Sequence, residues 1–209
     1  MRTVVVVACC LCAGVGSVVA QERQVGAKAG ATSASLKYTT PSDDPGFGHR
    51  LFVGGGAFFV QPLHGPLALQ VEGLYMPKGA EMVETDGSVE VTTTLIFDYF
   101  EIPALARVSV ARSSARNVYV FGGPFAAMRL NAKLRQAVGR PVTSGVTTDI
   151  SPDVKLFDLG MTVGGGVDVS RHLVVDARYA WGLADVNKDV ASLPDVRTRT
   201  FAVLVGFRY

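Results

Sequence analysis

Two carboxylates in the middle of strand-like segments are the residues with the clearest potential for chemistry. Glu72 and Glu101 each occupy a polar position in an alternating segment, residues 67–76 and 95–110. Two neighbouring carboxylates raise the pKa of one of them, as acid–base sites require. Arg178 should lie at a similar height in another alternating segment, and its guanidinium would satisfy both acids. The pattern therefore predicts an ion-paired plug rather than an acid–base site.

The other charged residues of the alternating segments follow the same parity. Acids and bases in similar numbers share one face, because strand side chains alternate with period two. The predicted interior set is Glu72, Glu101, Arg107, Arg129, Asp158, Asp168, Asp176, Arg178 and Arg208. We expect Arg129 to pair with Asp158 at one end. At the other end, Arg208 should pair with Asp168 and Asp176, since an unpaired buried charge is costly.

No catalytic, cofactor-binding or metal-binding residue is predicted. The three histidines, His49, His64 and His172, fall in connections, and His49 belongs to the opposite rim from the other two. Ser170, His172 and Asp176 are close in sequence, but a hydrolytic triad is defined by geometry and not by proximity along the chain.

The glycine triplets at 54–56 and 164–166 do not complete the phosphate-binding pattern GxGxxG. Phe59 and Val169 stand at its last position, and no helix is predicted to follow either triplet. We interpret these glycines as making room inside a narrow barrel or allowing the chain to bend.

The N-terminus has the layout of a secretory signal peptide. A basic start precedes an apolar stretch from Val4 to Val19, and Ala20 ends a small-residue cleavage site. We expect residues 1–20 to be removed and residues 21–209 to form one domain. All three cysteines (Cys9, Cys10, Cys12) lie in the removed part. Residues 6–9 also resemble a lipoprotein cleavage box, but the apolar stretch before Cys9 is too short for one.

The charge of the mature chain excludes one class of partner. Removal of Arg2 leaves 19 basic residues against 18 acidic ones. A nucleic-acid-binding protein would carry a basic surface, so we predict no such partner.

Eight alternating segments follow one another, and no helical periodicity of useful length is present. They span about residues 23–37, 51–60, 67–76, 95–110, 118–130, 157–168, 173–183 and 200–209. The connections alternate between short ones (62–66, 111–117, 170–172) and long polar ones (38–50, 77–93, 131–155, 184–198). Long loops on one rim and short turns on the other are typical of a membrane barrel. The sequence predicts an all-β fold, an eight-stranded antiparallel up-and-down transmembrane β-barrel with both termini at the short-turn rim.

The contents of the two faces favour a membrane barrel over a soluble one. The polar face carries glycine, threonine and alanine with balanced arginines and carboxylates, which suits a narrow lumen. The apolar face places Tyr75, Tyr179 and Trp181 toward the long loops, and Phe207 and Tyr209 toward the opposite end. Aromatic residues at both ends of an apolar band mark the membrane interfaces.

Two prolines interrupt the fourth and fifth segments. Proline donates no ladder hydrogen bond and is normally confined to edges or bulges. If Val110 faces Val118, then Pro103 faces Phe125 and Pro124 faces Ala104. We therefore predict one shared interruption of the ladder in the form of a bulge. A weakly bonded position for each proline is the alternative.

Four stretches resemble the small outer-membrane β-barrel family, often described as porin-family or PorT-like. They are residues 98–105, 121–125, 158–166 and 178–183. The resemblance covers essentially all of the mature chain and implies a barrel in the outer membrane of a Gram-negative bacterium. The final Phe-x-Tyr resembles the closing strand that the barrel-assembly machinery reads in that class.

The resemblance brings no active site with it. The leading hypothesis is a non-enzymatic, porin-like outer-membrane barrel with an occluded lumen and loops that interact with the surroundings, because eight strands leave room for little besides side chains. We expect a monomer without cofactor, surrounded by outer-membrane lipid, with a loop ligand that the sequence does not identify. The alternatives are an outer-membrane lipid-modifying enzyme and a soluble periplasmic lipocalin-like lipid carrier.

Overall fold

The computed structural model describes residues 23–38, 48–86, 89–113, 116–139, 144–184 and 196–209. The predicted signal peptide lies outside these residues. The strands are β1 (Gln24–Tyr38), β2 (Arg50–Pro62), β3 (Leu67–Asp86), β4 (Val89–Arg112), β5 (Asn117–Val138), β6 (Ser144–Asp149), β7 (Phe157–Asp168), β8 (Leu173–Gly182) and β9 (Val196–Arg208). A single 3₁₀ turn, η2 (Ser151–Asp153), is the helix among them. No described helix has the length and apolarity to cross a membrane.

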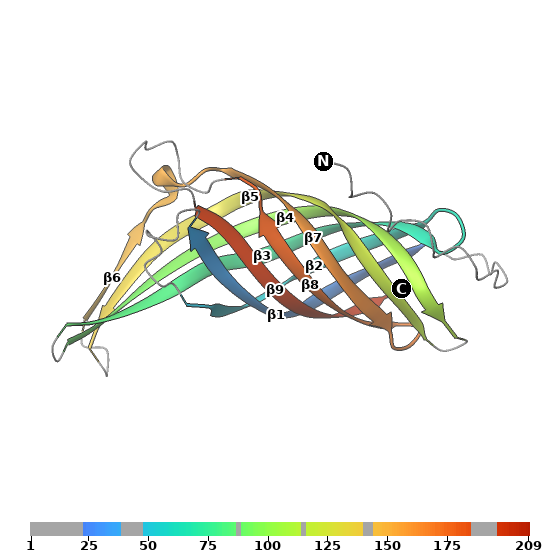
Figure 1. The fold of residues 1–209 in the computed structure, drawn as a ribbon, viewed down its shortest axis with the longest axis horizontal. Coiled ribbons are helices and arrows are strands. Elements are labelled where there is room, and N and C mark those ends of the chain that lie inside the picture. The colour runs from blue at the N-terminus through green and yellow to red at the C-terminus, as the bar shows by residue number, and fades with distance from the viewer. Residues whose placement is uncertain (1–22, 39–47, 87–88, 114–115, 140–143, 185–195) are drawn as a thin grey trace, which may run out of the picture.

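Eight of the strands close into a ring (Figure 1). Each pairs antiparallel with its neighbour along the chain, and β1 pairs with β9 from Gly26 opposite Arg208 to Tyr38 opposite Val196. The remaining strand, β6, pairs with the far end of β5 and lies outside the ring. The predicted eight-stranded up-and-down barrel is confirmed.

Both described ends of the ring lie at the short-turn rim. Tyr209 donates its backbone N–H to the carbonyl of Val25 at 2.8 Å. The side chain of Arg208 reaches the carbonyls of Ser170 and Arg171 in the β7–β8 turn, at 3.1 and 2.8 Å. The end of the chain is therefore held against a short turn.

Two of the predicted long loops are largely strand, which corrects the sequence interpretation. β3 and β4 continue in register to Asp86 opposite Val89, where residues 77–93 were expected to form a loop. β5 continues to Val138, and β6 pairs with it from Lys133 opposite Asp149. Val89, Val91 and Thr92 are β-branched and extend the strand pattern, because such side chains pack well on a pleated surface.

We call the part of the sheet beyond the ring the outer sheet. It consists of residues 81–86 of β3, 89–94 of β4, 133–138 of β5 and all of β6. Figure 1 shows it extending past one end of the barrel, beside the label of β6.

The ring carries its apolar face outward and its polar face inward. Large exposed apolar side chains include Phe59, Leu69, Ile102, Val120, Leu159, Val163, Phe201, Val203, Val205 and Phe207. Alternating residues of the same strands are buried and include charged side chains. A lipocalin-like carrier would have the reverse arrangement, so this alternative is excluded.

The two prolines share one interruption of the ladder, as predicted. Pro103 lies opposite Phe125, but the next two pairs of the β4–β5 ladder are missing, and pairing resumes at Ala106 opposite Gly122. The β3–β4 ladder also breaks between Val71–Ala104 and Leu74–Glu101.

The predicted bulge at the prolines is wrong, because the register is the same on both sides of the gap. The register shifts of β4 and β5 lie elsewhere, between Asp98 and Tyr99 and between Ser109 and Ala111. Val118 therefore faces Ala111 and not Val110.

Candidate functional site in the barrel interior

The middle of the interior holds a four-residue ion cluster drawn from three strands. Lys28 of β1 places its Nζ 2.7 Å from Glu72 Oε1 and 2.7 Å from Asp176 Oδ2. Arg178 of β8 contacts the same two acids, with Nη2 3.1 Å from Glu72 Oε1 and 2.9 Å from Asp176 Oδ1. All four side chains are buried. Each of the two acids therefore pairs with both cations. The pair of Asp176 with Arg178 lies within β8, and the contact of Arg178 with Glu72 of β3 crosses the lumen.

A second cluster lies toward the short-turn rim. Arg107 donates to both oxygens of Asp168, at 3.0 and 3.1 Å. Arg208 Nη1 lies 2.8 Å from Asp168 Oδ2, and Asn117 also donates to that oxygen. Gln70 joins the two clusters, because it accepts from Arg107 at 3.3 Å and donates to Glu72 at 2.6 Å.

A third, smaller cluster lies toward the long-loop rim. Lys78 of β3 places its Nζ 2.7 Å from Glu101 Oε1 and 3.5 Å from Asp158 Oδ2. Thr198 donates to the same Asp158 oxygen at 3.2 Å. Glu72 and Glu101 therefore belong to different clusters, each with its own lysine.

The structure buries seven of the nine residues of the predicted interior set. Arg208 keeps 12% of its side chain exposed at the rim, and it pairs with Asp168, whereas Asp176 pairs with Lys28 and Arg178. The predicted contact of Arg129 with Asp158 is wrong. Arg129 donates instead to the carbonyls of Ser151, Val154 and Lys155.

Sequence reasoning missed two buried cations. Lys28 shares the face of Thr32 in the first alternating segment, so its parity could have identified it. Lys78 follows Pro77 in the stretch expected to be a loop, and no local signal places it inside. With both lysines and Arg208 included, the paired interior charges are five acids and five bases.

Aromatic rings line the interior next to every buried cation. Lys28 lies over Phe58, and Lys78 lies over both Tyr99 and Phe125, with distances of 4.7 to 5.0 Å to the ring centroids. Arg107 lies 3.5 Å from the centroid of Tyr119, and Arg178 lies 5.2 Å from that of Phe121. Desolvated contacts of this kind stabilise a buried cation further.

Glycines of β7 make room for three of these rings. A Cβ added to Gly160 would lie 2.4 Å from the ring of Phe125, and one added to Gly164 would lie 2.6 Å from that of Phe121. At Gly166 it would lie 2.5 Å from the hydroxyl oxygen of Tyr119. The interior glycines of β7 are therefore required by packing, and no phosphate loop is formed.

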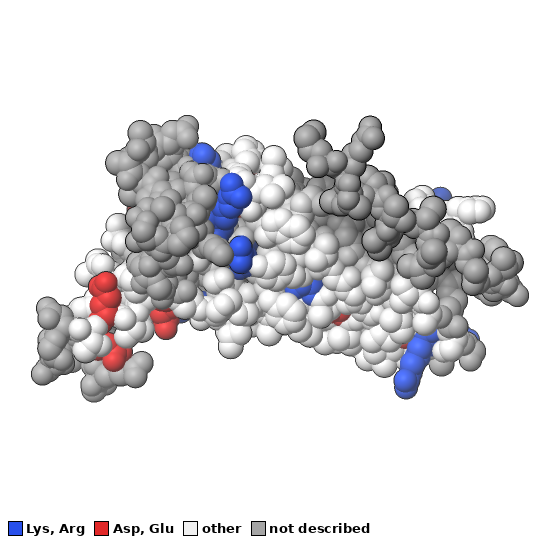
Figure 2. Space-filling model, in the orientation of Figure 1, with Lys and Arg blue, Asp and Glu red and all other residues white. Residues whose placement is uncertain are grey.

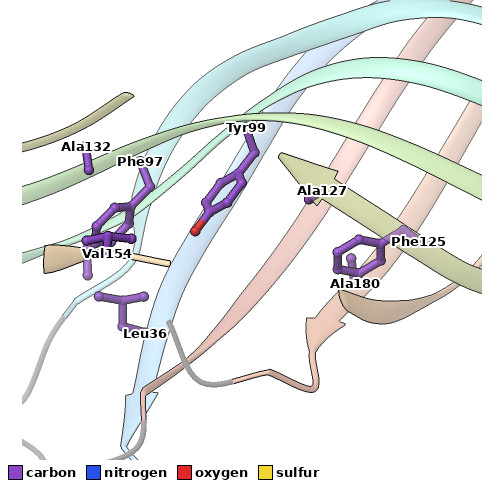
Figure 3. Close-up of a cluster of buried hydrophobic side chains, with 9 residues drawn as sticks. Leu36, Phe97, Tyr99, Phe125, Ala127, Ala132, Val154 and Ala180 are labelled. Carbon is purple, nitrogen blue, oxygen red and sulfur yellow. The ribbon is translucent and has the colours of Figure 1, made fainter. Parts of the chain in front are cut away.

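The long-loop end of the interior is closed by apolar side chains. We call this group the apolar cap; Figure 3 shows it, and its buried members are Leu36, Ala80, Phe97, Tyr99, Phe125, Ala127, Ala132, Val154 and Ala180. Val154 belongs to the connection between η2 and β7, yet only 4% of it is exposed. Ile150, which lies between β6 and η2, packs against the cap.

Hydrogen bonds hold η2 and the residues on either side of it in place. Arg129 Nη2 donates to the carbonyl of Ser151 at 2.9 Å, and the N–H of Ala132 donates to Ser151 Oγ at 3.1 Å. The N–H of Ser151 donates to Asp149 Oδ1 at 2.8 Å. Hydrogen bonds from Ser151 lower the pKa of the exposed Asp149 carboxyl below its ordinary value.

The other candidates for chemistry do not assemble into a site. Ser170 Oγ accepts from the backbone of the short turn, whereas Asp176 is buried among cations. His172 stacks on Phe207, and His49 lies beside Ser33. The described ranges contain no group of acids, histidines or cysteines arranged to hold a metal ion.

Several solved structures are similar to this chain at low sequence identity. The attachment invasion locus protein Ail of Yersinia pestis is 12% identical, with a TM-score of 0.44, over 90% of this chain and 100% of that one. Neisserial surface protein A is 15% identical, with a TM-score of 0.45, over 90% of this chain and 97% of that one. OprG of Pseudomonas aeruginosa is 9% identical, with a TM-score of 0.39, over 89% of this chain and 95% of that one.

No curated protein sequence matches the chain. The family model described as the outer membrane protein beta-barrel domain matches residues 19–188, which is most of the chain. This protein therefore belongs to the outer membrane protein beta-barrel domain family.

Proposed function

We propose that the protein is a sealed, non-enzymatic outer-membrane barrel that acts through its outer sheet and adjoining loops, and that its lumen conducts no solute. The observation that carries the proposal is the filling of the interior along its length. Two ion clusters occupy the lumen from the short-turn rim to its middle, and the apolar cap with the smaller Lys78 cluster occupies the long-loop end.

The ion clusters oppose solute flow because they leave no uncompensated charge to attract an ion. Glu72 and Asp176 each bind Lys28 and Arg178, and Asp168 binds Arg107 and Arg208. Removing one partner of such a pair costs about 3 to 5 kcal/mol. Transient opening by loss of a single pair is therefore rare.

The same pairing argues against acid–base catalysis by the interior carboxylates. A general base needs a free oxygen within reach of a substrate proton. The carboxylate of Glu72 is engaged by Lys28, Gln70 and Arg178, and it is buried in the middle of the barrel. An outer-membrane lipid-modifying enzyme would require a set of reactive side chains at one rim.

The outer sheet is the part with surface to offer a partner. Within the described ranges, β6 pairs with β5 alone, so its other edge presents free backbone groups. The corresponding end of β3 is met by a single bridge, Gly48 opposite Glu81. Exposed strand edges can accept a further strand from another chain.

Solute uptake by proteoliposomes tests the proposal. Vesicles containing the mature protein should swell in small sugars no faster than empty vesicles, while a general porin in the same lipid gives rapid swelling. The folded fraction should be checked by the electrophoretic mobility of unheated samples. Swelling in proportion to the amount of folded protein would overturn the sealed barrel and support a pore.

A further inference from the structure

The outward face of β9 changes character abruptly along its length. From the short-turn end, Phe207, Val205, Val203 and Phe201 are exposed apolar side chains. The next two outward positions are Arg199 and Arg197, both exposed. Such a change is expected where a strand leaves the hydrocarbon core of a membrane.

Aromatic residues on β8 mark the same level. Tyr179 lies opposite Phe201 and Trp181 lies opposite Arg199 in the ladder. Their rings are 6.0 Å apart between centroids. Tyrosine and tryptophan concentrate at the interface between lipid and water, so the two arginines lie at the level of the lipid headgroups.

The two arginines differ from the arginines of the interior in their partners. Interior Arg107 and Arg178 each bind at least one carboxylate. Among the described residues, neither Arg197 nor Arg199 forms an ion pair with an acid. Figure 2 shows basic side chains (blue) on the mostly white wall toward the end that carries the outer sheet, and others toward the opposite end.

The spacing of the two arginines suits a phosphate-bearing ligand. Residues two apart on a strand are about 7 Å apart, so Arg197 and Arg199 could hold one phosphate or two neighbouring ones.

We propose that Arg197 and Arg199, with Trp181 beside them, form a binding site for the phosphate-bearing headgroup of an outer-leaflet lipid. Each guanidinium can donate two parallel hydrogen bonds to phosphate oxygens. The indole ring of Trp181 would cover the lipid where the headgroup meets the acyl chains. The site faces the outer leaflet because the long loops of such barrels are external.

Trp181 is the only tryptophan of the chain, so its fluorescence reports on the site directly. The protein is placed in bilayers of phosphatidylcholine with brominated acyl chains, which quench Trp181. Unbrominated lipid A with two phosphates is then titrated in. Lipid that displaces the quencher from the site restores the fluorescence.

The double variant R197Q/R199Q should require roughly thirtyfold more lipid A for the same recovery, with two headgroup-level arginines lost. The variant R116Q/R171Q removes two exposed arginines from the opposite rim and should titrate as the unmodified protein does. Dephosphorylated lipid A should restore little fluorescence, and free inorganic phosphate should restore none.

Three results would overturn the proposal. One is an unchanged titration for folded R197Q/R199Q, and another is equal recovery with phosphorylated and dephosphorylated lipid A. The third is recovery with inorganic phosphate alone, because the site would then hold a free anion and not a lipid.

Discussion

The two halves of the barrel interior hold charged and apolar side chains in different proportions. From the middle toward the short turns, Lys28, Glu72, Asp176 and Arg178 meet from strands on opposite sides of the lumen. In the half toward the long loops, the apolar cap packs beside one smaller ion cluster, in which Lys78 pairs with Glu101 and Asp158. An ion cluster tolerates no loss of a member, whereas an apolar cluster tolerates changes that conserve volume. The charged half therefore specifies the arrangement of the strands, and the apolar half closes the mouth.

The largest expected effect comes from a substitution of similar volume made in each half. Arg178→Met leaves Glu72 and Asp176 with Lys28 as their remaining cation and should lower the free energy of unfolding by about 3 to 5 kcal/mol. Leu36→Met in the apolar cap should cost less than about 1.5 kcal/mol. Urea unfolding in lipid vesicles measures both. Similar decreases in the free energy of unfolding for the two variants would contradict a difference between the halves.

The next effect concerns the glycines that accommodate the interior rings. Gly164→Ala places a methyl group against Phe121 and the carbonyl of Ala177, and should cost about 1 to 3 kcal/mol. Gly122→Ala is the matched control, because its Cβ would meet its nearest neighbours at 3.5 Å. Thermal unfolding of both variants provides the comparison. A stable Gly164→Ala barrel would show that this part of the interior is not tightly packed.

A local effect is expected at the apolar cap. Val154→Asp should release the connection between η2 and β7, because a buried apolar contact would be replaced by a charge. Trypsin should then cleave after Lys155 roughly tenfold faster than in the unmodified protein, while the ring stays folded. Val146→Asp on β6 changes a valine that is 65% exposed and should leave this rate unaltered. Equal cleavage in all three proteins would mean that Val154 does not hold the connection.

The smallest effect is a difference in amide exchange along the wall. Ala104 and Leu105 lack ladder partners on β5, whereas Thr162 and Val163 are paired on both sides. Hydrogen exchange in detergent micelles should be roughly tenfold faster at the first two amides. Equal protection at the two places would argue that the gap at the prolines does not weaken the wall.

The ring was predictable because each of its strands has two unlike faces. Period-two alternation of Phe201, Val203 and Val205 with small residues identifies the strand and its outward side. The same parity placed Glu72 and Asp176 on the inward side, where the structure buries them. Pro103 opposite Phe125 was predicted from a hairpin register that is wrong by one residue at the turn, and the register shift between Ser109 and Ala111 compensates for that difference.

The outer sheet and the individual ion pairs could not be predicted in the same way. Residues 77–93 carry polar and turn-forming side chains on both faces, so parity gives no inward side there. The partner of Asp158 depends on which strands meet across the lumen, and Lys78 was not expected to be a strand residue at all. Arg129 donates hydrogen bonds to backbone carbonyls in and just after η2. The residues of that segment follow no periodic pattern, so their position could not be predicted.

Single-channel recording in planar bilayers tests most directly whether the two halves seal the lumen independently. The protein to measure is the variant with Lys28, Glu72, Asp176 and Arg178 all changed to alanine, which removes two positive and two negative charges. If the apolar cap closes the lumen by itself, folded channels of this variant and of the unmodified protein will both remain silent. Discrete openings in either protein would contradict the account, and openings in the variant alone would assign the seal to the ion cluster.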